Sequence, residues 1–102
     1  MIVRQVRYLM DPWAAKGGPQ SRRIQRQRAE KFALWCQKRG IRDLRQVGKR
    51  QVIGFLRELE TSGRSAKTIQ GHWYALRALF RLAELPEPVR FISEADKSKS
   101  AS

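Results

Sequence analysis

The amino-acid sequence predicts an all-α fold, a small bundle of three long helices with room for a short fourth. Apolar residues recur at helical spacing in three separate stretches, and no stretch shows the apolar–polar alternation typical of a strand. Glycine- or proline-containing segments, at which helices commonly end, separate the three stretches. A chain of 102 residues is long enough for one domain with a single modest core.

The first expected helix runs from about residue 19 or 21 to Arg39. Ser21 is a plausible N-cap residue, and Gly40 stands where a helix commonly ends. The residues expected on its inner face are Ala29, Phe32, Ala33 and Cys36, with Ile24 and Trp35 beside them. Because Cys36 is the single cysteine, an intramolecular disulfide framework and a cysteine-rich zinc site are both excluded.

A connector and two further helices follow. Ile41 and Leu44 are expected to reach the core from the connector at residues 41–48, and the second helix runs from about Lys49 to Thr61. The third helix spans residues 65–83, with Ser65 as its N-cap residue. Its expected apolar face contains Ile69, Trp73, Leu76, Phe80 and Leu82.

The two ends of the chain are expected to differ from the middle. Residues 1–18 are interpreted as an N-terminal arm whose short helix is broken at Asp11-Pro12, because the residue before a proline is pushed out of the helical region. Residues 19–92 form the expected helical domain, with residues 89–92 as the short fourth element. Residues 93–102 lack large apolar side chains and are predicted to be a disordered tail.

The charge is strongly positive and unevenly distributed. The chain has 22 Lys and Arg against 9 Asp and Glu, a net charge of +13, and residues 1–50 account for +11 of it. Such an excess points to nucleic acid or to an acidic membrane surface as the partner. No signal peptide and no apolar run of membrane-spanning length are evident, so a cytoplasmic, nucleoid-associated protein with no membrane partner is expected.

Two polar surfaces are candidates for contact with an anion. The first two turns of the first helix carry Arg22, Arg23, Arg26 and Arg28. Cations at this end oppose the helix dipole at a cost of roughly 0.3–1 kcal/mol each. This arrangement suggests a partner that supplies negative charge; the alternative is a basic face that is simply solvated. On the third helix, the face opposite Ile69 and Trp73 carries Lys67, Gln70, Gly71, Tyr74 and Arg81.

The order of these features resembles the core-binding domain of tyrosine recombinases, the N-terminal SAM-like domain of phage integrases (Cre- and Xer-like). The resemblance covers about residues 21–88 and depends on an ordered set of features rather than on one motif. The matching residues are Ser21, Phe32, Trp35, Cys36 and Gly40-Ile41, then Val52, Phe55-Leu56 and Leu59, then Gly63, Ser65-Ala66-Lys67-Thr68-Ile69, Leu76, Arg77, Phe80 and Leu85-Pro86. It implies a small orthogonal SAM-like bundle that forms one half of a clamp on duplex DNA. The DNA-facing residues that it implies are Arg22, Arg23, Arg26 and Gln27 on the first helix and Lys67, Thr68, Gln70 and Gly71 on the third, beside Tyr74 on the same polar face.

The family's catalytic domain has no counterpart in this sequence, so we expect no catalytic residue, no metal, no cofactor and no enzyme activity. The expected function is a duplex DNA-binding module, with a recombinase catalytic chain or self-association on DNA as further partners. One alternative is a protein–protein interaction module of a mobile-element or regulatory complex. Another is an RNA or single-strand binder, for which Tyr74 and the tryptophans would have to be exposed. His72 is interpreted as a packed histidine rather than a metal ligand.

Overall fold

The computed structural model describes residues 2–16 and 20–88, without the side chains of Gln20 and Ser21. This part contains four α-helices and one 3-10 helix: α1 (Ile2–Lys16), α2 (Gln20–Lys38), η1 (Leu44–Gln46), α3 (Lys49–Thr61) and α4 (Ala66–Leu82). No strand occurs among the described residues. The predicted all-α bundle is confirmed.

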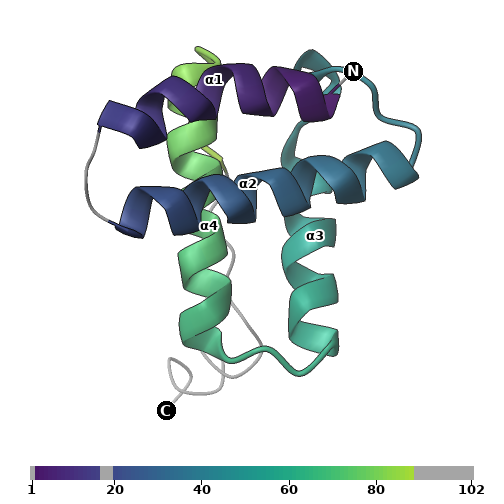
Figure 1. Ribbon diagram of the computed structural model, residues 1–102. Helices are drawn as coiled ribbons and strands as arrows, with labels where there is room; N and C mark the ends of the chain where they lie inside the picture. Colours follow the sequence, from purple (N-terminus) through teal and green to yellow (C-terminus); the bar gives the residue numbers. More distant parts are fainter. Residues whose placement is uncertain (1, 17–19, 89–102) are drawn as a thin grey trace.

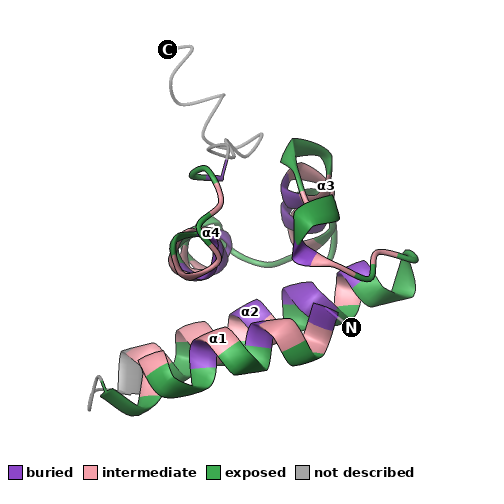
Figure 2. Ribbon diagram, turned by 90° about the horizontal axis from the view of Figure 1, so that it is seen from above, coloured by how far each residue is buried: buried purple, intermediate pink, exposed green. Residues whose placement is uncertain are grey.

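The helices form two crossing pairs. Figure 1 shows α1 and α2 side by side and antiparallel, with α3 and α4 running antiparallel to each other across them. Viewed from above, α3 and α4 lie on one side of the α1–α2 pair (Figure 2). The α2 helix contacts all three other helices, and its most extensive contact is with α1. It is therefore the central element of the bundle.

A single core lies between the two pairs. Phe32 of α2 and Phe55 of α3 meet edge to face with ring centroids 5.2 Å apart. Leu44 reaches the same core from η1, as the sequence predicted. The largest fully buried side chains come from all four helices: Phe32, Ile2, Met10, Leu56, Leu76, Leu79, Val6, Val52 and Cys36.

The buried face of α4 differs from the predicted one. Ile69, Leu76 and Phe80 are buried as expected, but Trp73 and Leu82 are only partly buried against the core. The buried residues also include His72, Ala75 and Leu79. The reason is that α4 packs against both α2 and α3, which covers a second stripe along the helix. Trp73 is thereby left at the edge of the covered face.

The predicted break at Asp11-Pro12 is wrong, because α1 continues through Pro12 to Lys16. Proline removes the amide that would donate to the carbonyl of Tyr8, at a cost of about 3 kcal/mol in a helix interior. Packing offsets this cost: Ile2, Val6 and Met10 form a fully buried stripe along α1. Both Tyr8 and Pro12 are exposed, so the carbonyl that loses its donor can bind water. The bundle thus has four long helices rather than three.

The other predicted boundaries agree closely with the structure. The bounds of α3 are the predicted ones, and Ser65 accepts a hydrogen bond from the Thr68 amide at the start of α4. Gly40 follows the end of α2 at a φ of 82°, which favours glycine. Ser21 is not an N-cap residue, since α2 begins at Gln20. The short fourth element at 89–92 and the tail at 93–102 lie outside the described residues, and the division at residues 18 and 19 stays a prediction.

We expect the Pro12→Ala variant to be more stable than the wild type by about 1–3 kcal/mol, because alanine restores the missing hydrogen bond within α1. Chemical denaturation of both proteins, followed by circular dichroism, measures the difference. The Ala14→Pro variant, which places the ring two residues further along the same helix, is the opposite control and should be destabilised. A Pro12→Ala variant no more stable than the wild type would show that α1 does not depend on helical continuity at this residue.

Candidate nucleic-acid interface

Arg22, one of the cations assigned to the interface, binds the end of α1. Its Nη1 donates to the carbonyl oxygen of Trp13 at 2.8 Å. The guanidinium also lies over the Trp13 ring, with Cζ 4.6 Å from the centroid. The last four carbonyls of a helix lack intrahelical donors and carry its negative partial charge. Arg22 of α2 therefore caps the C-terminal end of α1.

Arg26 belongs to an ion-pair network between the same two helices. Its Nε donates to the carboxylate of Asp11, and this hydrogen bond is the main reason that the pKa of Arg26 is raised. Its Nη1 lies 3.6 Å from Oε2 of Glu30. The other carboxylate oxygen of Glu30 accepts a hydrogen bond from Arg7 of α1. Exposed pairs of this kind contribute roughly 0–1 kcal/mol each. Together they set how α1 lies along α2.

Part of the negative charge expected from an external partner thus comes from the chain itself. Asp11 and the carbonyl of Trp13 face Arg26 and Arg22 across the contact between α1 and α2. Arg23 and Gln27, the other two assigned residues of α2, are exposed, and no other described residue binds their side chains. The exposed polar surface of α2 that can meet a ligand is consequently narrower than the sequence suggested.

The assigned residues of α4 lie within its first three turns. Lys67 and Gln70 are exposed, and Tyr74 is 42% exposed with its ring edge-on to Trp73. Thr68 is half-buried, and its hydroxyl oxygen accepts a hydrogen bond from the Ser65 hydroxyl at 3.0 Å. Lys67, Gln70 and Tyr74 are therefore the assigned side chains of α4 that are open to a partner.

Gly71 marks the point where α2 and α4 cross. A Cβ atom added there would lie 2.9 Å from Cζ of Arg28 and closer still to one of its terminal nitrogens. The guanidinium of Arg28 thus rests directly against the backbone of α4, and a longer residue at position 71 would displace it. A glycine inside a helix predicts such a close approach, but the sequence gave no indication that Arg28 is the approaching group.

His72 lies directly behind this crossing. It is buried with 5% exposure, its ring meets Phe55 edge to face, and its Nδ1 has no hydrogen-bond partner. Burial, together with the positive charges of Arg28, Lys31 and Arg64, lowers the pKa of His72 to about 4. The packed histidine predicted from the sequence is confirmed. Lys31 and Arg64 join this arrangement without having been assigned to the site.

Trp35 is one of the aromatic residues that the single-strand alternative requires to be exposed, but it already contacts α3 and Arg39. Trp35 is partly buried, and its Nε1 donates to Glu58 of α3 at 2.5 Å. Arg39 binds the same carboxylate at 2.9 Å and covers the Trp35 ring with Cζ 4.2 Å from the centroid. These two hydrogen bonds hold the pKa of Glu58 below its usual range. Trp35 therefore joins α2 to α3.

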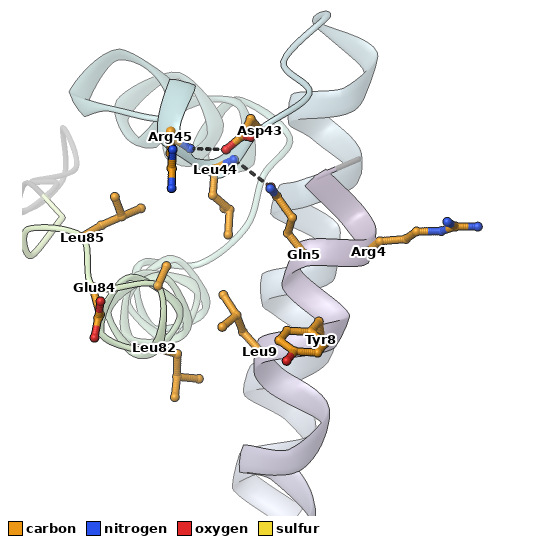
Figure 3. A pocket seen from close by; sticks show the side chains of 11 residues that line it. Arg4, Gln5, Tyr8, Leu9, Asp43, Leu44, Arg45, Leu82, Glu84 and Leu85 are labelled. Atoms are coloured by element: carbon orange, nitrogen blue, oxygen red, sulfur yellow. Dashed lines mark hydrogen bonds between the residues drawn. The ribbon is translucent and has the colours of Figure 1, made fainter.

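The described part of the chain also contains a cleft. It has a volume of about 470 Å³ and is formed by α1, η1 and the C-terminal end of α4 (Figure 3). Gln5 supports it by accepting a hydrogen bond from the Leu44 amide at 2.9 Å. Tyr8 at its rim is 81% exposed. The cleft includes no residue that the sequence assigned to DNA binding.

Neither a metal-binding cluster nor an exposed cysteine occurs among the described residues. Over this part of the chain, no group of three or more His, Cys, Asp and Glu side chains is placed to bind a metal ion. Cys36 is buried, and burial raises the pKa of its thiol to about 12. None of the described helices combines the length and apolar character needed to cross a bilayer.

The fold and the polar surface define a small, basic helical-bundle domain. A family model described as "Phage integrase, N-terminal SAM-like domain" matches residues 6–85, which is most of the chain. The chain therefore belongs to the family of phage integrase N-terminal SAM-like domains, and the resemblance seen in the sequence is confirmed. Comparisons with curated proteins and with solved structures gave no match.

The depressed pKa of His72 predicts a pH-dependent stability. Because the pKa is lower in the folded protein than in the unfolded chain, protonation favours unfolding. Stability should be full above about pH 6.5 and fall by about 2–3 kcal/mol as the pH approaches the folded-state pKa of about 4. Denaturation of the wild type and of the His72→Phe variant at pH 7 and pH 5 measures this effect. The variant should lose less stability than the wild type between pH 7 and pH 5. Equal losses in the two proteins would contradict the lowered pKa of His72.

Proposed function

We propose that the chain is a duplex DNA-binding module that is non-catalytic by itself and acts in the cytoplasm, associated with the nucleoid. The observation that supports the proposal best is a set of cations on α2 and around the start of α4 that have no acidic partner among the described residues. Arg23, Arg28, Lys31, Arg64 and Lys67 all lie on these helices or at the start of α4. No described residue forms an ion pair with any of them.

The distribution of the acids explains why this surface is the basic one. Asp11, Glu30 and Glu58 neutralise arginines at the contacts of α2 with α1 and α3. Among the described residues, no such carboxylate pairs with the cations where α2 meets α4, so their positive charge is available to a phosphate backbone. Gln27 and Gln70 lie among the exposed cations and offer amides to phosphates or base edges. The membership of the integrase domain family is consistent with this function.

Arg22 and Arg26 have a secondary role in this proposal. Their guanidinium groups already bind Trp13 and Asp11, and contact with DNA would require them to share or leave these partners. Their main contribution is to hold α1 against α2. The α2 surface that contacts DNA is then centred on Arg23 and Gln27.

The cleft between α1, η1 and the end of α4 supports a second function, the binding of a protein partner. It is mostly apolar in its floor, with Leu9, Leu82 and Leu85 among its lining residues. A protein partner, such as a recombinase catalytic chain or a second copy bound to DNA, would use a surface of this kind. This function is compatible with DNA binding, because none of the cations proposed to contact DNA lines the cleft.

Binding to a duplex should depend steeply on salt. Contacts to about four to six phosphates predict a slope of about −4 to −5 in a plot of log affinity against log salt concentration. Fluorescence anisotropy with a labelled duplex of about 20 base pairs, at several salt concentrations, measures the slope. A competing single strand of the same length distinguishes duplex binding from the single-strand alternative. An affinity that does not change with salt would contradict the proposal.

Charge reversal on the two helices should have separate and comparable effects. Arg23→Glu and Lys67→Glu should each weaken duplex binding at least tenfold, about 1.4 kcal/mol. Both side chains are exposed and outside the core, so the melting temperature should change little. Arg50→Glu is the matched control, because Arg50 is also exposed but lies at the start of α3. Equal losses in all three variants would indicate a diffuse effect of net charge rather than an interface on α2 and α4.

A further inference from the structure

Three cations near His72, on α2 and just before α4, form no ion pair with any acid among the described residues. Arg28 and Lys31 come from α2, and Arg64 precedes the N-cap residue of α4. Each is close enough to His72 for its charge to act on that imidazole. Within the described part of the chain, no hydrogen bond or ion pair occupies the side chain of any of the three. Like charges held together in this way repel one another unless an anion joins them.

The backbone and the side chains behind the cations are arranged around this point as well. Gly71 provides the space in which the Arg28 guanidinium rests against α4. His72 is 95% buried next to it, with Nδ1 unpartnered, although a buried polar atom is normally hydrogen-bonded. Arg64 adds its own charge just before α4, and the first turn of α4 adds the positive end of the helix dipole. An unpaired cation cluster and a buried, unsatisfied polar group therefore occur together.

We infer that Arg28, Lys31 and Arg64 form a binding site for a single phosphate group of a nucleic-acid backbone, with Gly71 as the space that holds Arg28 in place. The inference rests on the proposed function, which it narrows from a basic surface to one defined contact. Arg28 and Arg64 present planar, multiply donating groups that suit phosphate oxygens, and Lys31 adds a point charge. Gly71 has a role in binding although it has no side chain, because it positions Arg28.

His72 makes the site observable without touching the ligand. A bound phosphate would offset the charges of Arg28, Lys31 and Arg64, which are the groups that oppose protonation of His72 from α2 and from the turn before α4. The neighbouring face of α3 offers the uncharged ring of Phe55. The pKa of His72 should therefore rise when the site is filled, although burial keeps it below the ordinary value.

The first experiment measures duplex affinity and its salt dependence by fluorescence anisotropy. Arg28→Gln and Arg64→Gln should each weaken binding about five- to tenfold and reduce the magnitude of the salt slope by about 1. Arg50→Gln removes the same charge at the start of α3 and should change affinity less than twofold. Equal effects of the Arg50→Gln control and the two site variants would overturn the inference while leaving duplex binding intact.

The Gly71→Ala variant separates the site from a structural role. Alanine favours a helix more than glycine does, and the group that must move is the flexible end of Arg28, so the melting temperature should be unchanged or higher. Affinity for the duplex should nevertheless fall about as much as in Arg28→Gln. Unchanged affinity would contradict the role given to Gly71 and to the position of Arg28.

The second experiment follows the His72 imidazole by NMR during a pH titration. The wild type is titrated alone, with the duplex, and with inorganic phosphate against chloride at equal ionic strength. An upward shift of the His72 pKa with the duplex, lost in Arg28→Gln, supports the site. If the wild type binds no duplex, the proposed function fails, and the phosphate arm then decides: an upward shift supports an anion site, and no shift overturns it.

Discussion

The crossing of α2 over α4 is the contact on which the rest of the structure depends. Residue 71 of α4 is glycine, and the guanidinium of Arg28 from α2 fills the space that a side chain would take there. The same contact buries His72 and brings Lys31 and Arg64 close to it. Without this approach, the cations of α2 and the exposed side chains of α4 would belong to separate surfaces. A packing constraint thus determines where positive charge accumulates.

The arginines of α2 and of the turn that follows it have different tasks. Arg22 and Arg26 bind the end and the side of α1, and Arg39 binds Glu58 of α3. These contacts use three of the few carboxylates in the first 60 residues: Asp11, Glu30 and Glu58. Arg23 and Arg28 have no carboxylate partner in the part of the chain that the structure describes. Much of the basic composition therefore supports the fold, and the proposed interface depends on the smaller group of cations that remains.

The sequence was sufficient to predict the features that depend on local chemistry. Helical spacing placed α3 correctly, and Ser65 was recognised as a cap. Features that depend on tertiary packing were missed. Pro12 is tolerated because Ile2, Val6 and Met10 bury a continuous stripe on α2's side of α1, which no local propensity reveals.

The candidate site was predictable only in part for the same reason. Arg22 and Arg26 were assigned to DNA because helical phase cannot show that α1 supplies Asp11 and the Trp13 carbonyl. Arg64 was not assigned, since its approach to the α2 cations follows from the crossing and not from its place in a turn. His72 was correctly interpreted as packed, but its position behind three cations could be seen only in the structure.

The most direct test of this account is to map a duplex onto the ¹⁵N-labelled protein by NMR. The account predicts amide shift changes concentrated in residues 23–31 of α2 and in residues 64–74 around the start of α4. The amides of α1 and those at the start of α3 should change little. Changes centred on the cleft between α1, η1 and the end of α4, with the α2–α4 crossing unaffected, would contradict the account.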